Sequence, residues 1–151
     1  MIERIYIDTS VIGGYFDEEF ELYTKLFFER VEKGKIKVVL SDLLATELKG
    51  APENVLNFYH SIPKAQIEYA EQTEDSIKLA EEYLKEGVVG KTSKIDCRHI
   101  AIATLVNADI LVSWNFKHIV NIARIRGYNS VNIKLGHRIL EIRTPREILE
   151  T

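Results

Sequence analysis

Several features that would place this 151-residue chain in particular protein classes are scarce or missing. It has one cysteine, Cys97, which excludes an internal disulfide and gives no cysteine-based metal site. No apolar run approaches the roughly 20 residues of a membrane-spanning helix, and the N-terminus lacks a basic region followed by a long apolar stretch. We therefore expect one folded domain, residues 1–151, of a cytoplasmic protein with no membrane partner.

Lys and Arg, 20 in all, are slightly outnumbered by 23 Asp and Glu, and the positive charge is unevenly distributed. The formal net charge of −3 argues weakly against a general nucleic-acid binder. Residues 1–90 hold 10 Lys and Arg against 18 Asp and Glu, a net charge of −8, whereas residues 91–146 hold 10 against 3, a net charge of +7. Either the C-terminal half has an anionic partner, or the two halves pack together and neutralise each other.

Short β-branched runs alternate with helical patterns along the chain, which predicts an α/β fold. We expect a single domain with a central, mostly parallel sheet of four to five strands flanked by helices. The expected strands are Ile5–Ile7, Lys37–Leu40, Ile110–Ser113, Leu140–Arg143 and an edge strand at Gln66–Glu71. The expected helices are Glu19–Lys33, Asp42–Lys49, Glu53–Ser61, Glu74–Glu86, Ile95–Asn107 and Lys117–Arg126, with Gly34 and Gly127 as helix stops.

Three acids lie in otherwise apolar segments. Asp8 directly follows the first expected strand, Glu47 lies in the helix after the second, and Asp96 begins the helix before the third main strand. Because ligands of open α/β sheets bind outside the carboxyl ends of the strands, these side chains can converge at one edge. Two carboxylates about 4 Å apart repel by roughly 4 kcal/mol at an effective dielectric near 20. A cluster of all three therefore predicts a divalent-metal site.

Each acid also has a simpler structural explanation. Asp8 is of a type that often caps a helix N-terminus, and Asp96 is an acid that the helix dipole favours in a first turn. Glu47 fits a solvent-facing helix position paired with a lysine. The apolar setting that the three acids share favours the metal site over these explanations.

Four segments, taken in order, resemble the PIN domain, the small α/β nuclease module of the VapC-type toxins. They are Tyr6–Ser10, Ser41–Leu48, Asp96–Ala103 and Ala108–Phe116. The resemblance covers nearly the whole chain and implies a divalent-metal-dependent endoribonuclease that hydrolyses RNA phosphodiester bonds. It further implies Mg²⁺ or Mn²⁺ as cofactor, a toxin–antitoxin pair with an antitoxin protein as partner, and a homodimer. Carried over to this sequence, it implies that Asp8, Glu47 and Asp96 are catalytic and bind the metal.

The chain departs from the family pattern at the fourth acid, where Asn115 stands in place of an aspartate. An asparagine can offer a carbonyl oxygen to a metal but brings no negative charge, so a one-metal site should survive the change better than a two-metal site. Asp109 is no substitute, because it precedes its strand and should lie well over 10 Å from the carboxyl end, at about 3.3 Å per residue. We assign Asn115 to the catalytic set together with the three acids.

Other polar residues near the same edge are candidates for supporting roles. Ser10 and Ser113 are expected to hydrogen-bond the metal ligands. His99 lies three residues after Asp96, as His118 does after Asn115, so each could orient a ligand, contact phosphate or transfer a proton, or be purely structural. The candidate RNA-binding cations are Lys91, Lys94, Arg98 and Lys117.

Three functions are compatible with these residues. The first is the metal-dependent toxin ribonuclease, and the second is a weakly active or inactive PIN-like module that binds RNA or a protein, which Asn115 supports. The third is a phosphate-binding regulatory domain resembling a response-regulator receiver. A receiver would need an acid pair after its first strand, and Asp8 is followed by Thr9 and Ser10 instead.

Overall fold

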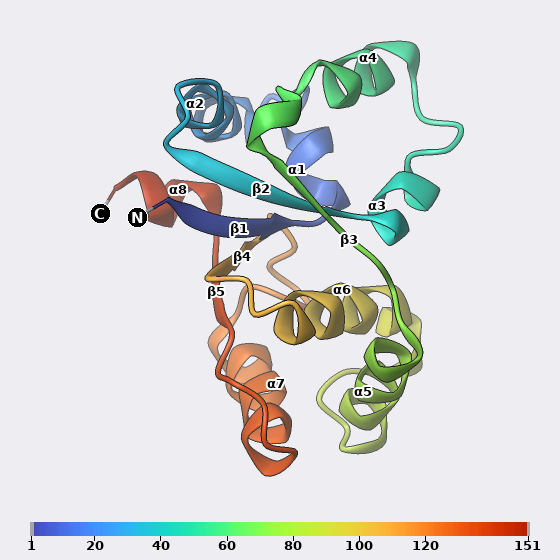
Figure 1. Cartoon of the computed structure of the whole chain (residues 1–151). Helices are drawn as coiled ribbons and strands as arrows, with labels where there is room; N and C mark the ends of the chain where they lie inside the picture. Colours follow the sequence, from blue (N-terminus) through green and yellow to red (C-terminus); the bar gives the residue numbers. More distant parts are fainter. Residues whose placement is uncertain (1, 151) are drawn as a thin grey trace.

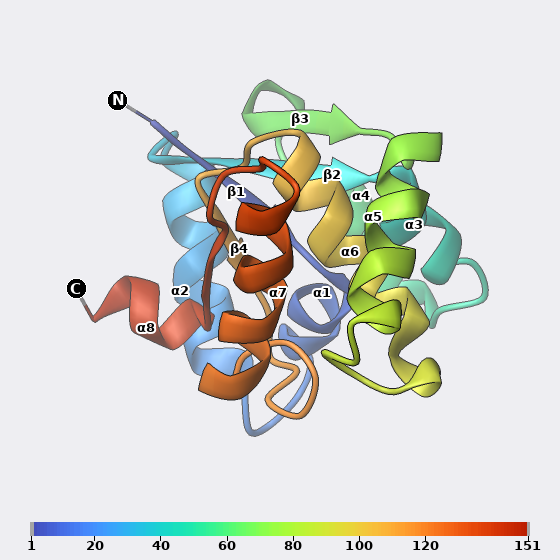
Figure 2. The ribbon, with the colours of Figure 1, turned by 90° about the horizontal axis from the view of Figure 1, so that it is seen from below.

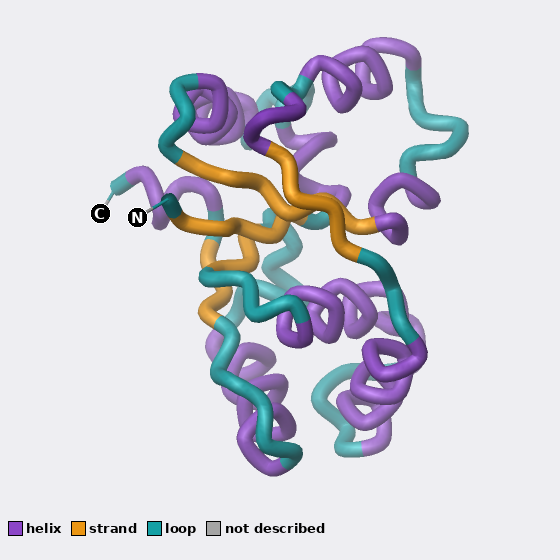
Figure 3. Tube along the Cα trace, viewed as in Figure 1, coloured by secondary structure: helices purple, strands orange, loops and turns teal. Residues whose placement is uncertain are grey.

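A five-stranded, fully parallel sheet forms the centre of the computed structural model, which describes residues 2–150. The strand order is β3-β2-β1-β4-β5, so the chain starts in the middle of the sheet and builds outward on both sides (Figures 1 and 3). The strands are β1 (Glu3–Ile7), β2 (Ile36–Ser41), β3 (Ile67–Ala70), β4 (Ile110–Val112) and β5 (Glu141–Arg143). All five expected strands are confirmed, with small differences at their ends.

Helices cover both faces of the sheet, as Figure 1 and the turned view of Figure 2 show. The α-helices are α1 (Thr9–Gly14), α2 (Glu21–Glu32), α3 (Asp42–Glu47), α4 (Glu53–Ser61), α5 (Glu74–Lys85), α6 (Lys94–Leu105), α7 (Ile122–Lys134) and α8 (Pro145–Leu149). Two 3₁₀ turns, η1 (Lys64–Gln66) and η2 (Lys91–Ser93), precede β3 and α6. None of the helices within residues 2–150 is long and apolar enough to cross a membrane.

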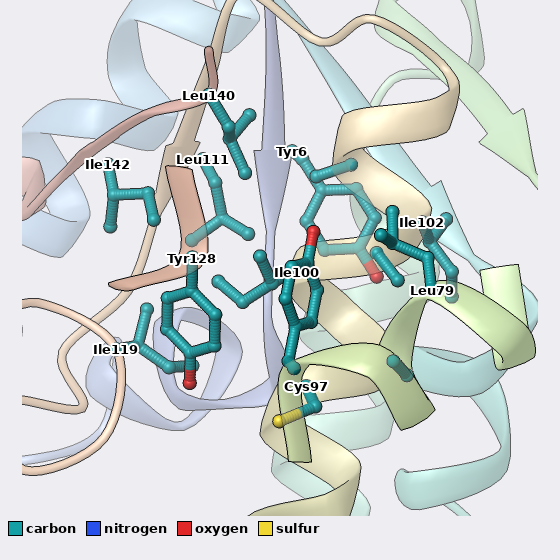
Figure 4. Packing of buried hydrophobic residues seen from close by; sticks show 14 of the residues in the cluster. Tyr6, Leu79, Cys97, Ile100, Ile102, Leu111, Ile119, Tyr128, Leu140 and Ile142 are labelled. Carbon is teal, nitrogen blue, oxygen red and sulfur yellow. The ribbon is translucent and has the colours of Figure 1, made fainter. Parts of the chain in front are cut away.

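Alternate residues of β1 supply two separate cores, because successive strand side chains point to opposite faces. Ile5 and Ile7 pack against α1 and α2 with Phe27, while Tyr6 packs on the other face against α5, α6 and α7. Figure 4 shows this second core, to which Ile100 and Tyr128 belong together with Tyr6. Burial on both faces explains why the central strands read as continuous apolar runs rather than alternating ones.

The structure confirms five of the expected helices and corrects the sixth. We expected Lys117–Arg126, but α7 begins at Ile122, where the side chain of Asn121 accepts a hydrogen bond from the Arg124 amide. The expected stop at Gly127 is wrong, because Gly127 lies inside α7. A Cβ there would meet Val88 Cγ1 at 2.7 Å, so the glycine serves close packing. Gly34 does end α2, with φ of +75°.

Two short helices, α1 and α8, were not expected. The C-terminal α8 has a sequence signature, because Thr144 and Glu147 form a reciprocal capping box around Pro145. The six-residue α1 starts directly after Asp8, which has extended backbone angles and occupies the N-cap position. Its side chain makes no capping hydrogen bond, so the capping explanation of this acid is wrong.

Candidate active site

Four of the expected site residues follow or flank the carboxyl ends of the central strands. Asp8 directly follows β1, Glu47 is the last residue of α3 after β2, Asp96 lies in the first turn of α6, and Asn115 follows β4. Figure 1 shows α1 and α3 at the ends of β1 and β2. The parallel pairing of β1 with β2 and β4 brings these ends to one edge of the sheet. Asp109, by contrast, accepts a hydrogen bond from the Arg4 amide at the opposite end.

Asp8 is almost fully buried, with 4% of its surface exposed. Ser10 Oγ donates to its Oδ1 at 2.6 Å, and Ser113 Oγ donates to its Oδ2 at 2.7 Å. Burial raises the pKa of Asp8, and the charge of Glu47 acts in the same direction, against the lowering effects of His99 and the two hydroxyls. The carboxylate is therefore hydrogen-bonded, and the charge of His99 offsets only part of the effect of burial.

The two serines also join the ends of β1 and β4. Ser10 Oγ accepts from the Trp114 amide at 2.8 Å, and Ser113 Oγ accepts from the Asn115 amide at 2.9 Å. Each hydroxyl thus accepts a hydrogen bond from a backbone N–H and donates one to Asp8. Ser10 and Ser113, which we expected to hydrogen-bond the acids, are thus both in direct contact with Asp8.

Asp96 is linked to both Asp8 and Asn115. Burial raises its pKa, and the nearby charge of Asp8 raises it further, while His118, His99 and a hydrogen bond from Asn115 lower it. Asn115 Oδ1 accepts from the His118 amide at 2.9 Å, and this backbone donor fixes the orientation of the side-chain amide. Asn115 therefore turns its NH₂ group toward Asp96, and its only side-chain oxygen is already engaged. The NH₂ group can donate to Asp96, and the oxygen keeps a second lone pair that it can offer to a metal.

Glu47 is anchored through one of its two oxygens. Its Oε1 accepts from Thr9 Oγ1 at 2.6 Å and lies 2.5 Å from His99 Nε2. Burial alone would raise the pKa of Glu47, but these two hydrogen bonds outweigh it and lower the pKa. The lysine pairing that the simpler explanation required is replaced by a pairing with a histidine that is 2% exposed.

The two histidines occupy different environments. His99 is buried between Glu47 and Tyr6, whose hydroxyl lies 2.6 Å from Nδ1. The backbone of His118 is held by two hydrogen bonds: its N–H donates to Asn115 Oδ1, and its C=O accepts from Tyr128 Oη at 2.8 Å. Its ring nitrogen Nδ1 is buried without a hydrogen-bond partner among residues 2–150, and its charge lowers the pKa of Asp96. Both rings therefore lie beside the acids.

The candidate RNA-binding cations are all on or near the surface. Lys91 and Lys94 are exposed around the start of α6, Lys117 is exposed after β4, and Arg98 is half-buried. None of them takes part in the ion pairs found within residues 2–150. Their charges are free to meet an anion.

The chemistry of the three acids suits a divalent cation, although they do not form a preformed cage. Carboxylate oxygens are the ligands that Mg²⁺ and Mn²⁺ prefer, and Asp8 interacts electrostatically with both Glu47 and Asp96. Within the described chain, however, no group of three or more His, Cys, Asp or Glu side chains is arranged so that it could hold a metal ion. Binding of a cation by all three acids would require side-chain movement.

Sequence reasoning missed Tyr6, Thr9 and Ser41. The Tyr6 hydroxyl donates to Ser41 Oγ at 2.9 Å, and Thr9 donates to Glu47. One signal was present: Tyr6 stands between isoleucines in a buried strand, and a buried phenol needs a hydrogen-bond partner. The identity of that partner depends on residues 35 and 93 positions away.

Comparison with known proteins gives the fold but not a close relative. No family model matches the sequence, and no curated protein matches it either. Among solved structures, VapBC2 from Rickettsia felis bound to a promoter DNA fragment matches with a TM-score of 0.57 and 13% identity, over 93% of this chain and 98% of that chain. DNA-bound VapBC from Salmonella typhimurium matches with a TM-score of 0.56 and 16% identity, over 96% and 99%.

A third match is the toxin VapC20 from Mycobacterium tuberculosis, described as cleaving the Sarcin-Ricin loop. It has a TM-score of 0.56 and 16% identity, over 75% of this chain and 91% of that one. This chain has the PIN-type fold of the VapC toxins. The resemblance read from the four sequence segments is thereby confirmed for the fold. At these identities the match to the VapC fold assigns no role to a particular residue.

The buried carboxyls predict a specific pH dependence. Above the pKa of about 3.9 of an unfolded aspartate, the unfolded chain ionises first, so rising pH disfavours the folded state until Asp8 and Asp96 also ionise. Asp8→Asn removes one of these charges and relieves Asp96. We expect the variant to gain free energy of unfolding relative to the wild type as the pH rises from 4 to 8, measured by urea unfolding in EDTA.

Asp109→Asn is the matched control, because it neutralises an aspartate at the opposite end of the sheet. Its pH curve should run parallel to that of the wild type. A curve for Asp8→Asn that also runs parallel to the wild type would contradict the raised pKa that burial gives Asp8.

Proposed function

We propose that this chain is a divalent-metal-dependent endoribonuclease, the toxin component of a toxin–antitoxin pair. The observation that supports this most is the placement of Asp8, Glu47 and Asp96 around the carboxyl ends of the strands, with Asp8 interacting electrostatically with both other acids, in a fold shared with an RNA-cleaving toxin. The cofactor would be Mg²⁺ or Mn²⁺, held by these three acids. The proposal includes an antitoxin protein and a homodimer as partners, in line with the VapBC complexes among the structural matches.

In the proposed reaction a water oxygen forms a bond to phosphorus, one P–O bond to a ribose oxygen breaks, and that oxygen takes up a proton. When bound, a divalent cation would activate the water and offset charge on the phosphate and the leaving oxygen. Ser10 and Ser113 hold Asp8 in one orientation through its two oxygens. Asn115 orients Asp96 by donating its amide hydrogen, and His118 lies beside Asp96 for contact with phosphate.

A second function is favoured by one specific observation. Asn115 supplies no charge, and its oxygen is engaged by the His118 amide, so the site has one carboxylate fewer than the family pattern. A PIN-like module that binds RNA or a protein without cleaving it would tolerate this substitution. The two functions differ in whether the wild-type chain cuts RNA at all.

The RNA-cleavage test compares the wild type, Asp8→Asn and Asn115→Asp in Mn²⁺ or Mg²⁺. We expect weak wild-type cleavage that EDTA abolishes and that Asp8→Asn lowers by about 100-fold or more, because a metal ligand is removed. Asn115→Asp should raise the rate, because the new carboxylate can keep the bond to the His118 amide while adding negative charge. Cleavage is measured on a labelled RNA by gel electrophoresis, with Asp109→Asn as the control.

Each result decides between the functions. Cleavage that persists unchanged in Asp8→Asn would overturn the proposed site. No wild-type cleavage, together with a strong gain in Asn115→Asp, would identify the binding module instead.

The exposed cations predict how RNA binding depends on salt. Removing a lysine that pairs with one phosphate should reduce the slope of log K against log salt by about 0.7 for single-stranded RNA. We expect Lys117→Ala to show this reduction when RNA binding is measured by fluorescence anisotropy in the Asp8→Asn background. Lys64→Ala is the matched control, because Lys64 lies in η1 at the other end of the sheet, just before β3. Equal slopes for the two lysine variants would remove Lys117 from the RNA-binding surface.

A further inference from the structure

A buried chain of hydrogen bonds leads from the core of the protein to Glu47. The Tyr6 hydroxyl lies 2.6 Å from His99 Nδ1 and 2.9 Å from Ser41 Oγ, and His99 Nε2 lies 2.5 Å from Glu47 Oε1. Tyr6 has no exposed surface, and its ring meets that of His99 edge to face at a centroid distance of 5.7 Å. Figure 4 shows Tyr6 surrounded by the apolar side chains of this core. The bonds from Tyr6 to Ser41 and His99 are therefore shielded from competing water, whereas the carboxylate of Glu47 reaches the surface.

Hydrogen bonds also link Tyr6 to both ends of helix α3, directly at one end and through His99 at the other. At the N-terminus, Ser41 Oγ caps the helix by accepting from the Leu44 amide at 3.1 Å, and the same oxygen binds Tyr6. At the other end, Glu47 is the last helical residue and reaches Tyr6 through His99. A helix of only six residues has little stability of its own. These hydrogen bonds act together with the buried Leu43 and Leu44 to hold α3 against the sheet.

The role of His99 as a donor does not depend on how the hydroxyl protons run. If Tyr6 donates to Ser41, His99 Nδ1–H donates to Tyr6 and both ring nitrogens of His99 carry a proton; if the hydroxyl protons are reversed, Tyr6 donates to Nδ1 of a neutral ring. In both arrangements His99 Nε2–H donates to Glu47, because an ionised carboxylate only accepts. The orientation of Glu47 is therefore fixed by geometry alone.

Both hydrogen bonds to Glu47 fall on Oε1, from His99 and from Thr9. Its other oxygen, Oε2, accepts no hydrogen bond within residues 2–150. We propose that Tyr6, acting through His99, is a positioning residue that fixes Oε1 so that Oε2 is free to bind the divalent cation. This inference rests on the proposed function, because it assumes that Glu47 is a metal ligand.

The same hydrogen bonds have an opposite interpretation, in which His99 holds Glu47 away from the cation. The two interpretations predict opposite changes in metal affinity when the hydrogen bond is removed. Removal of a positioning hydrogen bond weakens metal binding, typically by about 10- to 100-fold, whereas removal of a restraining one strengthens it.

The experiment measures Mn²⁺ affinity by isothermal titration calorimetry, with Tyr6→Phe as the test variant. Tyr83→Phe is a matched control, because Tyr83 is equally buried and its hydroxyl donates to Asn132 at 2.5 Å, among α5, α6 and α7. We expect Tyr6→Phe to bind Mn²⁺ about 10- to 100-fold more weakly than the wild type, and Tyr83→Phe to bind like the wild type. Thermal unfolding of both variants measures the loss of stability that each suffers when a buried tyrosine hydroxyl is removed.

A second pair of variants tests the path through His99. Gln at position 99 can still donate an amide hydrogen to Glu47, whereas Leu cannot, so His99→Gln should retain more Mn²⁺ affinity than His99→Leu. Tyr6→Phe binding equal to or tighter than the wild type would overturn the positioning role and leave the metal site standing. A wild-type protein that binds no Mn²⁺ would overturn both the positioning role and the proposed function.

Discussion

The structure of this site depends on one buried carboxylate, that of Asp8, at the end of the central strand. It is 4% exposed, and its hydrogen-bond partners are two serine hydroxyls; the ion pairs found in residues 2–150 do not include it. Burial of a charge is costly, and it raises the pKa of Asp8 even though the charge of His99 lowers that pKa in part. The same two hydroxyls join β1 to β4, so the sheet edge and the acid are held by one set of bonds. The proposed cation would stabilise a site built in this way.

The environment of Glu47 differs from that of Asp8, whereas the environment of Asp96 resembles it. Glu47 is neutralised in part by His99 and Thr9, and its pKa falls, whereas Asp96 stays close to Asp8 and its pKa rises. Asn115 relieves the Asp96 carboxylate by donating to it, where an aspartate would repel it. Asn115 thus lowers the pKa of Asp96 without adding a negative charge. This lowers the electrostatic strain of the metal-free protein and also lowers the charge available to hold a second cation.

The sequence alone predicted the strands and the parallel sheet, because these follow from local apolar patterns. The convergence of the acids on one cation stays a prediction, which rests on the rule that ligands bind at the carboxyl ends of strands. It did not predict that Glu47 pairs with His99 across 52 residues, or that Tyr6 connects them. Those interactions arise from tertiary packing, which local spacing does not encode. The start of α7 was missed for a related reason. Residues 115–120 satisfy their hydrogen bonds in a turn closed by Asn115 O rather than in a helix.

The most direct test of the shared cation site is thermal unfolding with increasing MnCl₂. A ligand that binds only the folded state at 100 times its Kd adds about 2.7 kcal/mol of stability, which corresponds to roughly 5–10 °C in Tm for a chain of this size. The account predicts such a rise for the wild type and little or none for Asp96→Asn. Equal shifts in the two proteins, or no shift in the wild type, would contradict it.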